Sequence, residues 1–427
     1  MSGSRRRYRG TAWALAWALV FVAGPAHAGA PSPRHSLLEP PPGVVVEGSH
    51  PDRLHPDRRM ELIARKIGQM IIVGFPGTEP GQPWPSRVAA MIADGRIGGV
   101  ILFGHNVRNP QQVRRLTGAM RAAGGGLTPF VTADQEGGYI QRFKRRQGFK
   151  GLPSSARTIS QKGLCNAWSV YLDAARELAS LGINVNFGPV VDLNVNPRSP
   201  AIGRLRRSYG VDPATVAGFA LQFIGAHAAA GVLAVAKHFP GHGSALLDPH
   251  KRVVDVTGTW RPEELEVFRD LIRDNAVPMI MVGHLIHPRF SDGDRPASLS
   301  RRAITLELRQ RLGFKGLIVT DDLGMDAITD RYGLEEAAVM AVRAGADVLI
   351  FANQRAGDNT LVDRVIARVS GAVAAGAVPE STLDRSYRRI LAAKRKLAAP
   401  PSGMAVPGLA DAVTQLCAIR RLAGYLD

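Results

Sequence analysis

The stretch from 233 to 250, LAVAKHFPGHGSALLDPH, gathers side chains that can donate, accept or transfer protons. It contains an amine, three imidazoles and a carboxylate, which belong to Lys237, His238, His242, His250 and Asp248. A lone histidine near a strand end is more often a hydrogen-bonded structural residue than a catalytic one. Five such groups together favour chemistry, because α/β enzymes place their active sites at the carboxyl ends of parallel strands.

The sequence around these groups changes from strand to loop within a few residues. The apolar run 233–236 predicts a buried parallel strand that ends before Lys237. The segment FPGHG that follows at 239–243 contains one proline and two glycines, which exclude a helix or a central strand. The reactive groups are therefore expected at a strand end and in the loop after it.

Seven further apolar runs predict strands, and a helical pattern precedes each of the eight. The predicted strands cover 71–75, 98–103, 129–134, 185–192, 233–236, 278–282, 316–320 and 347–351. The predicted helices cover 57–70, 84–94, 110–123, 166–181, 213–230, 262–275, 304–312 and 334–344, and two more at 360–375 and 379–397 close the chain. This alternation predicts an α/β fold, a single (β/α)8 TIM-type barrel.

An open, doubly wound sheet is the alternative fold, but no glycine-rich phosphate loop opens a helix after any predicted strand. A barrel, unlike an open sheet, brings every strand end to one mouth. The polar residues at the predicted strand ends are Asp134, Glu136, Asp192, Lys237, His238, His284, Asp321, Asp322 and Asn353. The segments 137–165, 193–212 and 239–261 are longer than ordinary connections, so we expect them to form walls or lids of the mouth.

Several carboxylates, a lysine, an arginine and several histidines at one mouth suit hydrolysis of a polyhydroxylated substrate. Glycoside cleavage needs one group at the anomeric carbon and another that protonates the leaving oxygen. A Schiff base on Lys237 is a rival chemistry. We predict no metal site and no cofactor, because His238 and His242 lie on a Pro-Gly loop and not on one face of a helix.

Eight segments together resemble glycoside hydrolase family 3, in its single-domain bacterial β-N-acetylglucosaminidase branch, over about residues 57–398. They are IGQMIIVGF, GGVILFGHNV, ADQEGGYIQR, INVNFGPVVDLN, RRSYG, KHFPGHG, PMIMVGHLIHP and GLIVTDDLGM. The most specific of them is KHFPGHG with its continuation x4-D-x-H, which ends at His250.

This resemblance implies a role for each matching residue. Asp321 matches the family's catalytic nucleophile, and His250 with Asp248 matches the acid/base dyad of this branch. The residues that match its sugar-binding positions are Asp134, Arg207, Lys237 and His238. His242 is interpreted as structural support, and Asp322 as a helix N-cap beside the site.

Two positions depart from the family's pattern. Pro249 stands inside the dyad where Ser or Thr is usual, and Tyr139 stands where the family often has Arg. Proline removes an N–H and favours extended geometry at Asp248, which either presets the dyad or spoils it.

The N-terminal sequence predicts export. Four arginines among residues 5–9, an apolar run at 11–23 that is too short to span a bilayer and the A-x-A site at 26–28 predict a signal peptide over residues 1–28, of the general secretory or the twin-arginine type. We expect residues 29–56 to be a Pro-rich disordered linker, 57–398 the barrel and 399–427 a C-terminal extension. No cysteine comes directly after the cleavage site, so no stable membrane anchor is expected.

The net charge of +18 and the pI of about 10.7 favour anionic surroundings such as a cell wall, or reflect an Arg-rich composition alone. No aromatic-interleaved basic stripe points to a nucleic acid. The two cysteines, Cys165 and Cys417, lie too far apart in sequence to indicate whether they pair.

The resemblance implies a retaining β-N-acetylhexosaminidase that acts on carbohydrates containing N-acetylglucosamine. Together with the N-terminal sequence, it predicts an exported monomer, periplasmic or secreted, whose substrates are of the murein or chitin type. Four alternatives stay open. They are a β-glucosidase, a β-xylosidase, a glycoside phosphorylase of the same family, and a catalytically silent barrel that binds cell-wall glycans.

Overall fold

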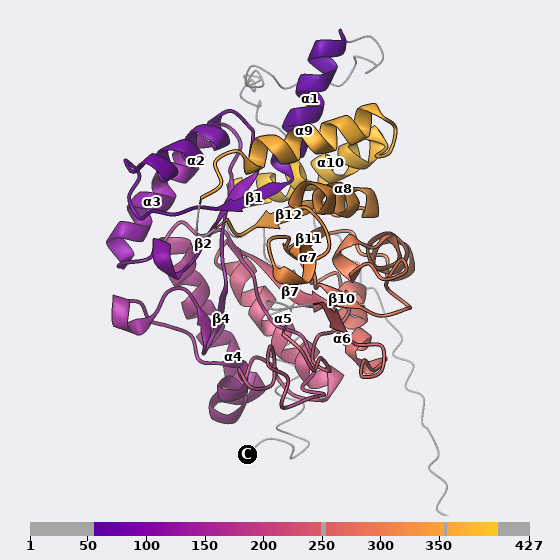
Figure 1. Ribbon diagram of the computed structural model, residues 1–427. Coiled ribbons are helices and arrows are strands. Elements are labelled where there is room, and N and C mark those ends of the chain that lie inside the picture. The colour runs from indigo at the N-terminus through magenta and orange to yellow at the C-terminus, as the bar shows by residue number, and fades with distance from the viewer. Residues whose placement is uncertain (1–54, 249–252, 354–356, 400–427) are drawn as a thin grey trace, which may run out of the picture. The chain divides into compact units, whose positions relative to one another are not determined.

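The computed structural model describes residues 55–248, 253–353 and 357–399 and contains the predicted barrel (Figure 1). Within these residues eight parallel strands close in the order β1-β12-β11-β9-β7-β6-β3-β2. The strands are β1 (Ile71–Gly74), β2 (Gly99–Leu102), β3 (Phe130–Ala133), β6 (Val185–Asn186), β7 (Leu233–Phe239), β9 (Met279–Val282), β11 (Leu317–Asp322) and β12 (Val348–Phe351). The prediction of a (β/α)8 TIM-type barrel is therefore confirmed.

Helices connect successive strands and pack around the barrel (Figure 1). They are α1 (Pro56–Gln69), α2 (Pro83–Ala93), α3 (Pro110–Ala123), α4 (Ser155–Ser180), α5 (Pro213–Ala229), α6 (Glu263–Arg273), the π-helix η5 (Arg302–Arg311), α7 (Asp326–Thr329), α8 (Leu334–Ala344), α9 (Leu361–Ala374) and α10 (Glu380–Ala398). Four of them begin with proline in the first turn, where its fixed φ suits a helix and its missing N–H has no intrahelical partner to lose.

Two short sheets lie outside the barrel. The strands β4 (Gln135–Gly137) and β5 (Ile140–Gln141) form an antiparallel hairpin directly after β3. The strands β8 (Val254–Asp255) and β10 (Leu285–Ile286) pair in parallel and join the segments that follow β7 and β9. Both sheets belong to the segments at the carboxyl ends of the barrel strands, where the predicted site lies.

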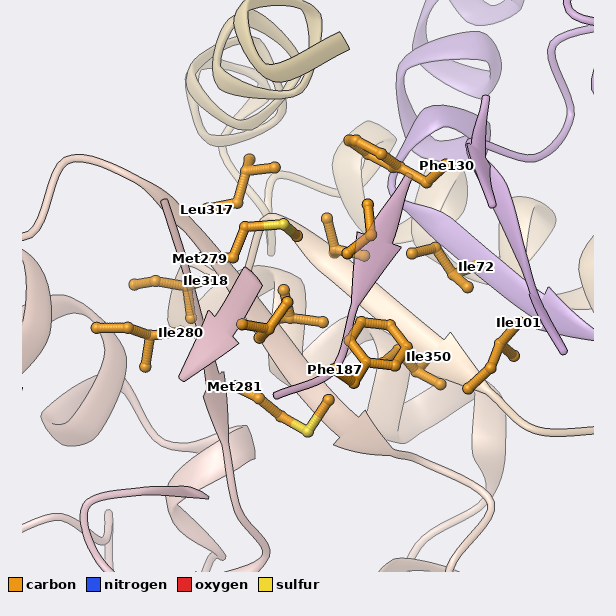
Figure 2. Close-up of a cluster of buried hydrophobic side chains, with 14 of the residues drawn as sticks. Ile72, Ile101, Phe130, Phe187, Met279, Ile280, Met281, Leu317, Ile318 and Ile350 are labelled. Atoms are coloured by element: carbon orange, nitrogen blue, oxygen red, sulfur yellow. The ribbon is translucent and has the colours of Figure 1, made fainter. Parts of the chain in front are cut away.

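The barrel strands are buried on both faces, as expected for a parallel sheet covered by helices. Figure 2 shows side chains from six of these strands, together with Phe187, clustered in the core. The labelled residues are Ile72, Ile101, Phe130, Phe187, Met279, Ile280, Met281, Leu317, Ile318 and Ile350. This apolar core fixes the strand ends, and therefore the side chains that they carry.

The segments after β3 and β6 differ from the prediction. The segment 137–165, expected to be a loop, holds the β4–β5 hairpin, the 3-10 helix η3 (Arg145–Gln147) and the start of α4. The α4 helix begins at Ser155 because Ser154 caps it, and Gly163, with φ of +61°, interrupts its geometry. The strand expected over 185–192 stops at Asn186, and one isolated bridge pairs Val190 with Lys237.

The predicted signal peptide, most of the linker and most of the C-terminal extension lie outside the described residues. Among the helices that the structure describes, none combines the length and the apolar composition required to cross a membrane.

Asp347 fastens the C-terminal helix to the barrel. Its fully buried carboxylate accepts hydrogen bonds from Arg309 on η5, from the Ile318 amide of β11, and from Ser386 and Arg389 on α10. One carboxylate therefore connects two strands to two helices.

We expect Asp347→Ala to lower the free energy of unfolding by about 3–5 kcal/mol, because it leaves two arginines without their common anion. Urea unfolding monitored by circular dichroism measures the change. The control is Asp363→Ala, which removes an exposed carboxylate from a surface pair with Arg96 and should change stability little. Equal losses in the two variants would show that the Asp347 network does not anchor α10.

Candidate active site

The carboxyl ends of the barrel strands surround a pocket of about 280 Å³. Its polar lining consists of Asp134, Glu136, Arg142, Arg207, Lys237, His238, His242, Asp248, Asp321 and Asp322. Apolar walls come from Phe103, Phe187, Met281, Met325 and Ile350, among others. Six of the seven predicted site residues are thus brought together, and the seventh, His250, lies outside the described residues.

Lys237 lies at the centre of the ionic contacts in this pocket. Its side chain is only 3% exposed, and its Nζ lies 2.8 Å from Asp134 Oδ1 and 2.6 Å from Glu136 Oε1. Burial disfavours the ammonium, but the two carboxylates outweigh this and raise the pKa of Lys237. A charged lysine is a poor Schiff-base nucleophile, so these contacts favour a binding role for Lys237 over the rival chemistry.

Asp134 is held between two cations. Its second carboxylate oxygen accepts a hydrogen bond of 2.8 Å from Arg142, whose guanidinium also lies over the Phe103 ring. Burial works against ionisation, yet Lys237 and Arg142 hold the pKa of Asp134 well below its usual value. Asp134 therefore presents a fixed, ionised acceptor to the pocket.

Glu136 binds Arg207 with both oxygens. Arg207 donates from Nε and Nη2 to the two oxygens of Glu136 at 2.7 and 2.8 Å, and from Nη1 to the Ala201 carbonyl. Such a bidentate pair fixes the guanidinium plane as well as its position. Arg207 reaches the pocket from the segment before α5, so this pair connects that segment to the end of β3.

His238 is oriented by Asp192. Its Nδ1 lies 2.7 Å from Asp192 Oδ2, and Asp192 Oδ1 accepts the backbone N–H groups of His238 and His242. A carboxylate on Nδ1 places the other ring nitrogen toward the pocket, where Arg207 lies 3.5 Å away. Asp192 thus fixes the ring and the turn after it at the same time.

Asp321 lies near the end of β11 with three basic side chains around it. Burial opposes ionisation, but the charges of His284, His238 and Lys237, with a hydrogen bond from the Asp322 amide, hold the pKa of Asp321 below its usual value. The carboxylate is therefore ionised near neutral pH. Asp248, from the loop after β7, lines the same pocket.

The structure corrects two of the predictions for this region. Asp322 is not a helix N-cap, because α7 starts at Asp326 and the Asp322 carboxylate accepts from the amides of Gly324 and Ala352. The strand predicted to end at Ala236 continues to Phe239 as β7. Lys237 and His238 are tolerated inside a buried strand because neighbouring elements supply the carboxylates that pair with them.

Sequence analysis gave no role to Glu136, Arg142, Asp192 or His284. All four lie in segments that resemble the family's motifs, but only the contacts of the first three reveal that they position Arg207, Asp134 and His238. His242 was interpreted as structural support, whereas it lines the pocket and neither ring nitrogen has a partner among the described residues. Burial, helped by the charge of His238, lowers the pKa of His242 to about 4, so its imidazole is neutral.

Among the described residues, no group of three or more His, Cys, Asp or Glu side chains is arranged to hold a metal ion. The arrangement offers ionised acceptors, fixed cations and neutral imidazole nitrogens around a small apolar-walled pocket. These are the contacts that a ring with several hydroxyl groups requires.

Comparison with known proteins agrees with this geometry. The sequence profile described as glycosyl hydrolase family 3 N terminal domain matches residues 62–393. The chain belongs to glycosyl hydrolase family 3. The expected family and the expected barrel are both confirmed.

Named relatives of this family 3 chain include two bacterial proteins. Beta-hexosaminidase A of Pseudoalteromonas piscicida is 34% identical over 343 residues, which are 75% of this chain and 57% of that protein. Beta-hexosaminidase LpqI of Mycobacterium tuberculosis is 34% identical over 345 residues, which are 77% of this chain and 82% of that one. The chain therefore spans little more than half of the first relative and most of the second.

A solved structure of a family 3 protein is also similar to this chain. The family 3 beta-N-acetylglucosaminidase from Paenibacillus sp. str. FPU-7 superposes with a TM-score of 0.72 at 33% identity and covers 78% of this chain and 62% of that one.

In this family 3 chain, Glu264 holds the base of the segment that carries Asp248. Its carboxyl oxygens accept the Gly243 amide at 2.9 Å and the Arg261 amide at 3.2 Å. A Cβ on Gly243 would lie 1.6 Å from the Leu193 carbonyl oxygen, so only glycine allows this close approach. Burial raises the pKa of Glu264 to about 7.

The raised pKa predicts a pH dependence of stability with a definite sign. The pKa of Glu264 is about 7 in the folded protein and 4.5 for an ordinary glutamate, so folding favours the protonated carboxyl. The contribution of Glu264 to the free energy of unfolding is therefore fully present below pH 4.5 and is lost as the pH rises through 7. The lowered pKa values of the buried His242 and His227 act in the opposite direction, so the Glu264 contribution must be measured as a difference.

We expect the unfolding free energy of the wild type, minus that of Glu264→Gln, to fall by on the order of 2 kcal/mol between pH 4.5 and 7. Urea unfolding at several pH values measures this difference. Glu263→Gln, at an exposed neighbour on the same helical turn, is the control and should give a curve parallel to the wild type. A pH-independent difference for Glu264→Gln would contradict the prediction.

Proposed function

We propose that the chain is a retaining β-N-acetylhexosaminidase that releases terminal β-linked N-acetylglucosamine from glycans. The observation that carries the proposal is that Asp321, held in its ionised form, and Asp248 line one pocket together with the Lys237–Asp134–Glu136 contacts. The relatives named beta-hexosaminidase and beta-N-acetylglucosaminidase support the same activity.

Asp321 is the proposed nucleophile. Its carboxylate attacks the anomeric carbon, the bond to the leaving oxygen breaks, and a covalent glycosyl-enzyme forms with inverted configuration. Water then attacks the same carbon and displaces Asp321, which restores the original configuration. The basic side chains around Asp321 favour its ionised form, and the Asp322 amide fixes one oxygen and so aims the other.

His250 is the proposed acid/base, with Asp248 as the carboxylate that orients it. In the first step the imidazolium gives its proton to the leaving glycosidic oxygen, and in the second step the neutral imidazole takes a proton from the attacking water. Histidine suits this double role because its ordinary pKa lies near neutral pH. The assignment of His250 rests on its sequence motif, and that of Asp248 also on its place in the pocket.

The remaining polar residues are proposed to hold the sugar. Asp134 accepts from ring hydroxyls, while Lys237 and Arg207 donate to hydroxyls or to the acetamido group. His238 offers one ring nitrogen, because Asp192 occupies the other. We add His242 to this set, since its neutral imidazole lines the pocket and has both nitrogens available within the part of the chain that the structure describes.

The site of action is proposed from the N-terminal sequence. A basic segment, an apolar run and an A-x-A site at 26–28 support export through a signal peptide, to the periplasm or beyond the cell. Murein and chitin fragments are the β-linked N-acetylglucosamine glycans that an exported enzyme meets there, and a monomer suffices because one chain supplies the pocket.

Replacement of the nucleophile tests the covalent step. We expect Asp321→Ala to lower kcat/KM on an aryl β-N-acetylglucosaminide by roughly ten-thousand-fold or more, since the glycosyl-enzyme can no longer form. The exposed Asp330→Ala is the matched control and should retain wild-type activity. A 5-fluoro N-acetylglucosaminyl fluoride should label the peptide that contains Asp321 in mass spectra, and a label on any other carboxylate would refute the assignment.

Leaving-group dependence tests the acid/base. We expect His250→Ala to lower kcat/KM by about 100- to 10,000-fold on a substrate with a basic leaving group. A dinitrophenyl glycoside should lose far less in the glycosylation step, because its leaving oxygen needs no proton. Added azide should then restore turnover of the glycosyl-enzyme and give a β-glycosyl azide. The exposed His55→Ala is the control. Equal losses on both substrates would contradict a proton-transfer role.

The same assays separate the alternatives. Turnover of an aryl β-glucoside or β-xyloside but not of the N-acetylglucosaminide would change the substrate class. Formation of sugar 1-phosphate in phosphate buffer would indicate a phosphorylase. Binding to murein without turnover of any glycoside would indicate a silent glycan-binding barrel.

A further inference from the structure

A basic recess lies beside the active-site pocket and is about four times larger, at about 1170 Å³ against about 280 Å³. Its walls are the segment 138–162, part of α4 and Arg206. Seven cations line it, and they are Lys144, Arg145, Arg146, Lys150, Arg157, Lys162 and Arg206. One carboxylate, that of Asp173, lines it as well, so the recess carries a strong excess of positive charge.

The charge of this recess is not balanced locally. No Asp or Glu occurs between Glu136 and Asp173, although the chain contains 36 acidic residues in 427. Elsewhere on the described surface, arginines form ion pairs with nearby carboxylates, as Arg115 does with Glu79 and Arg364 with Glu335. Within the described residues, none of the seven cations of the basic recess takes part in an ion pair.

The backbone also directs charge into the recess. Arg206 adopts φ of +55°, a left-handed conformation that is unfavourable for a residue other than glycine. The side chains of these two consecutive residues lie on different surfaces. Arg207 binds Glu136 in the pocket, and Arg206 lines the recess. Glycine would relieve the strain at this position, yet the sequence has an arginine there.

The recess and the pocket lie on either side of the same short segments, although they have no lining residue in common. Tyr139 and Gln141 line the recess and Ile140 between them lines the pocket, just as Arg206 and Arg207 divide between the two. The two hollows are therefore separated by no more than these short segments, a distance that the next units of a chain-like ligand can span when its terminal sugar is in the pocket.

We infer that the basic recess binds an acidic continuation of the glycan, whose carboxylate or phosphate groups pair with its lysines and arginines. The inference rests on the proposed function, because it places the terminal N-acetylglucosamine in the adjoining pocket. Glycan is favoured over nucleic acid because Tyr139, 69% exposed, is the only aromatic residue among the described residues that line the recess. Proteins that bind single strands present several stacking rings.

The test compares acidic with neutral substrates. The recess variant Arg146→Gln/Lys162→Gln/Arg206→Gln removes three exposed charges whose side chains make no hydrogen bond to the described residues. The control Arg87→Gln/Arg269→Gln/Arg343→Gln removes three exposed charges from α2, α6 and α8, so both variants lose the same net charge. The substrates are muropeptides that begin with N-acetylglucosamine, neutral chito-oligosaccharides of the same length and an aryl β-N-acetylglucosaminide.

We expect the recess variant to lose about tenfold in kcat/KM on muropeptides, mainly through KM, and to match the wild type on both neutral substrates. Raising NaCl from about 50 to about 500 mM should produce the same selective loss in the wild type. An equal loss on acidic and neutral substrates, a loss shared by the control variant, or no loss at all would overturn the inference.

A binding titration separates this inference from the proposed activity. Calorimetry at low salt compares wild type and recess variant with a carboxylated polysaccharide, with a phosphodiester-linked glycan polymer and with a single-stranded oligonucleotide. Weaker binding of either glycan by the recess variant supports the inference and identifies the anionic group, even if no glycoside is hydrolysed. Unchanged glycan binding, or recess-dependent binding of the oligonucleotide alone, refutes the inference whatever the activity.

Discussion

The active-site pocket depends on the ammonium of Lys237, which is buried inside strand β7. Taking a lysine out of water costs several kcal/mol unless anions compensate it, and here Asp134 and Glu136 do so from the end of β3. Each carboxylate in turn binds an arginine, Arg142 or Arg207. Opposite charges from the ends of β3 and β7 and from the segment before α5 therefore compensate one another's burial at the barrel mouth.

The sequence predicted the strands well because buried parallel strands are short apolar runs bounded by glycine, proline and polar residues. It failed where the outcome depended on partners from elsewhere in the chain. The β7 strand runs through Lys237 and His238 because β3 and Asp192 supply their anions. The start of α4 was not predicted because residues 155–162 contain only two apolar side chains, Ala156 and Ile159, and so show no apolar periodicity.

For the site, as for the fold, the sequence predicted which residues come together but not the contacts that hold them. Residue types at strand ends, with the motif resemblance, located six side chains that do line the pocket. Sequence could not reveal that Glu136 fixes Arg207, that Arg142 supplies the second cation of Asp134, or that Glu264 holds the Gly243 amide. Only the Glu136–Arg207 contact joins distant parts of the chain, but all three depend on burial and geometry, which a motif does not record.

Two kinds of charge arrangement lie next to each other in this protein, and the contrast between Arg207 and Arg206 shows the difference. Arg207 donates its hydrogen bonds to Glu136 and to the Ala201 carbonyl, so the position and the plane of its guanidinium are fixed. The Arg206 side chain makes no hydrogen bond to the described residues, and its backbone is strained, with φ of +55°. Balanced charges suit recognition of one ring in one orientation, whereas unbalanced, exposed cations suit a polymer whose anionic groups vary in position. For the proposed function, a pocket that holds one sugar in one orientation gains from a neighbouring surface that tolerates such variation, because the terminal sugar can then be bound accurately whatever follows it in the glycan.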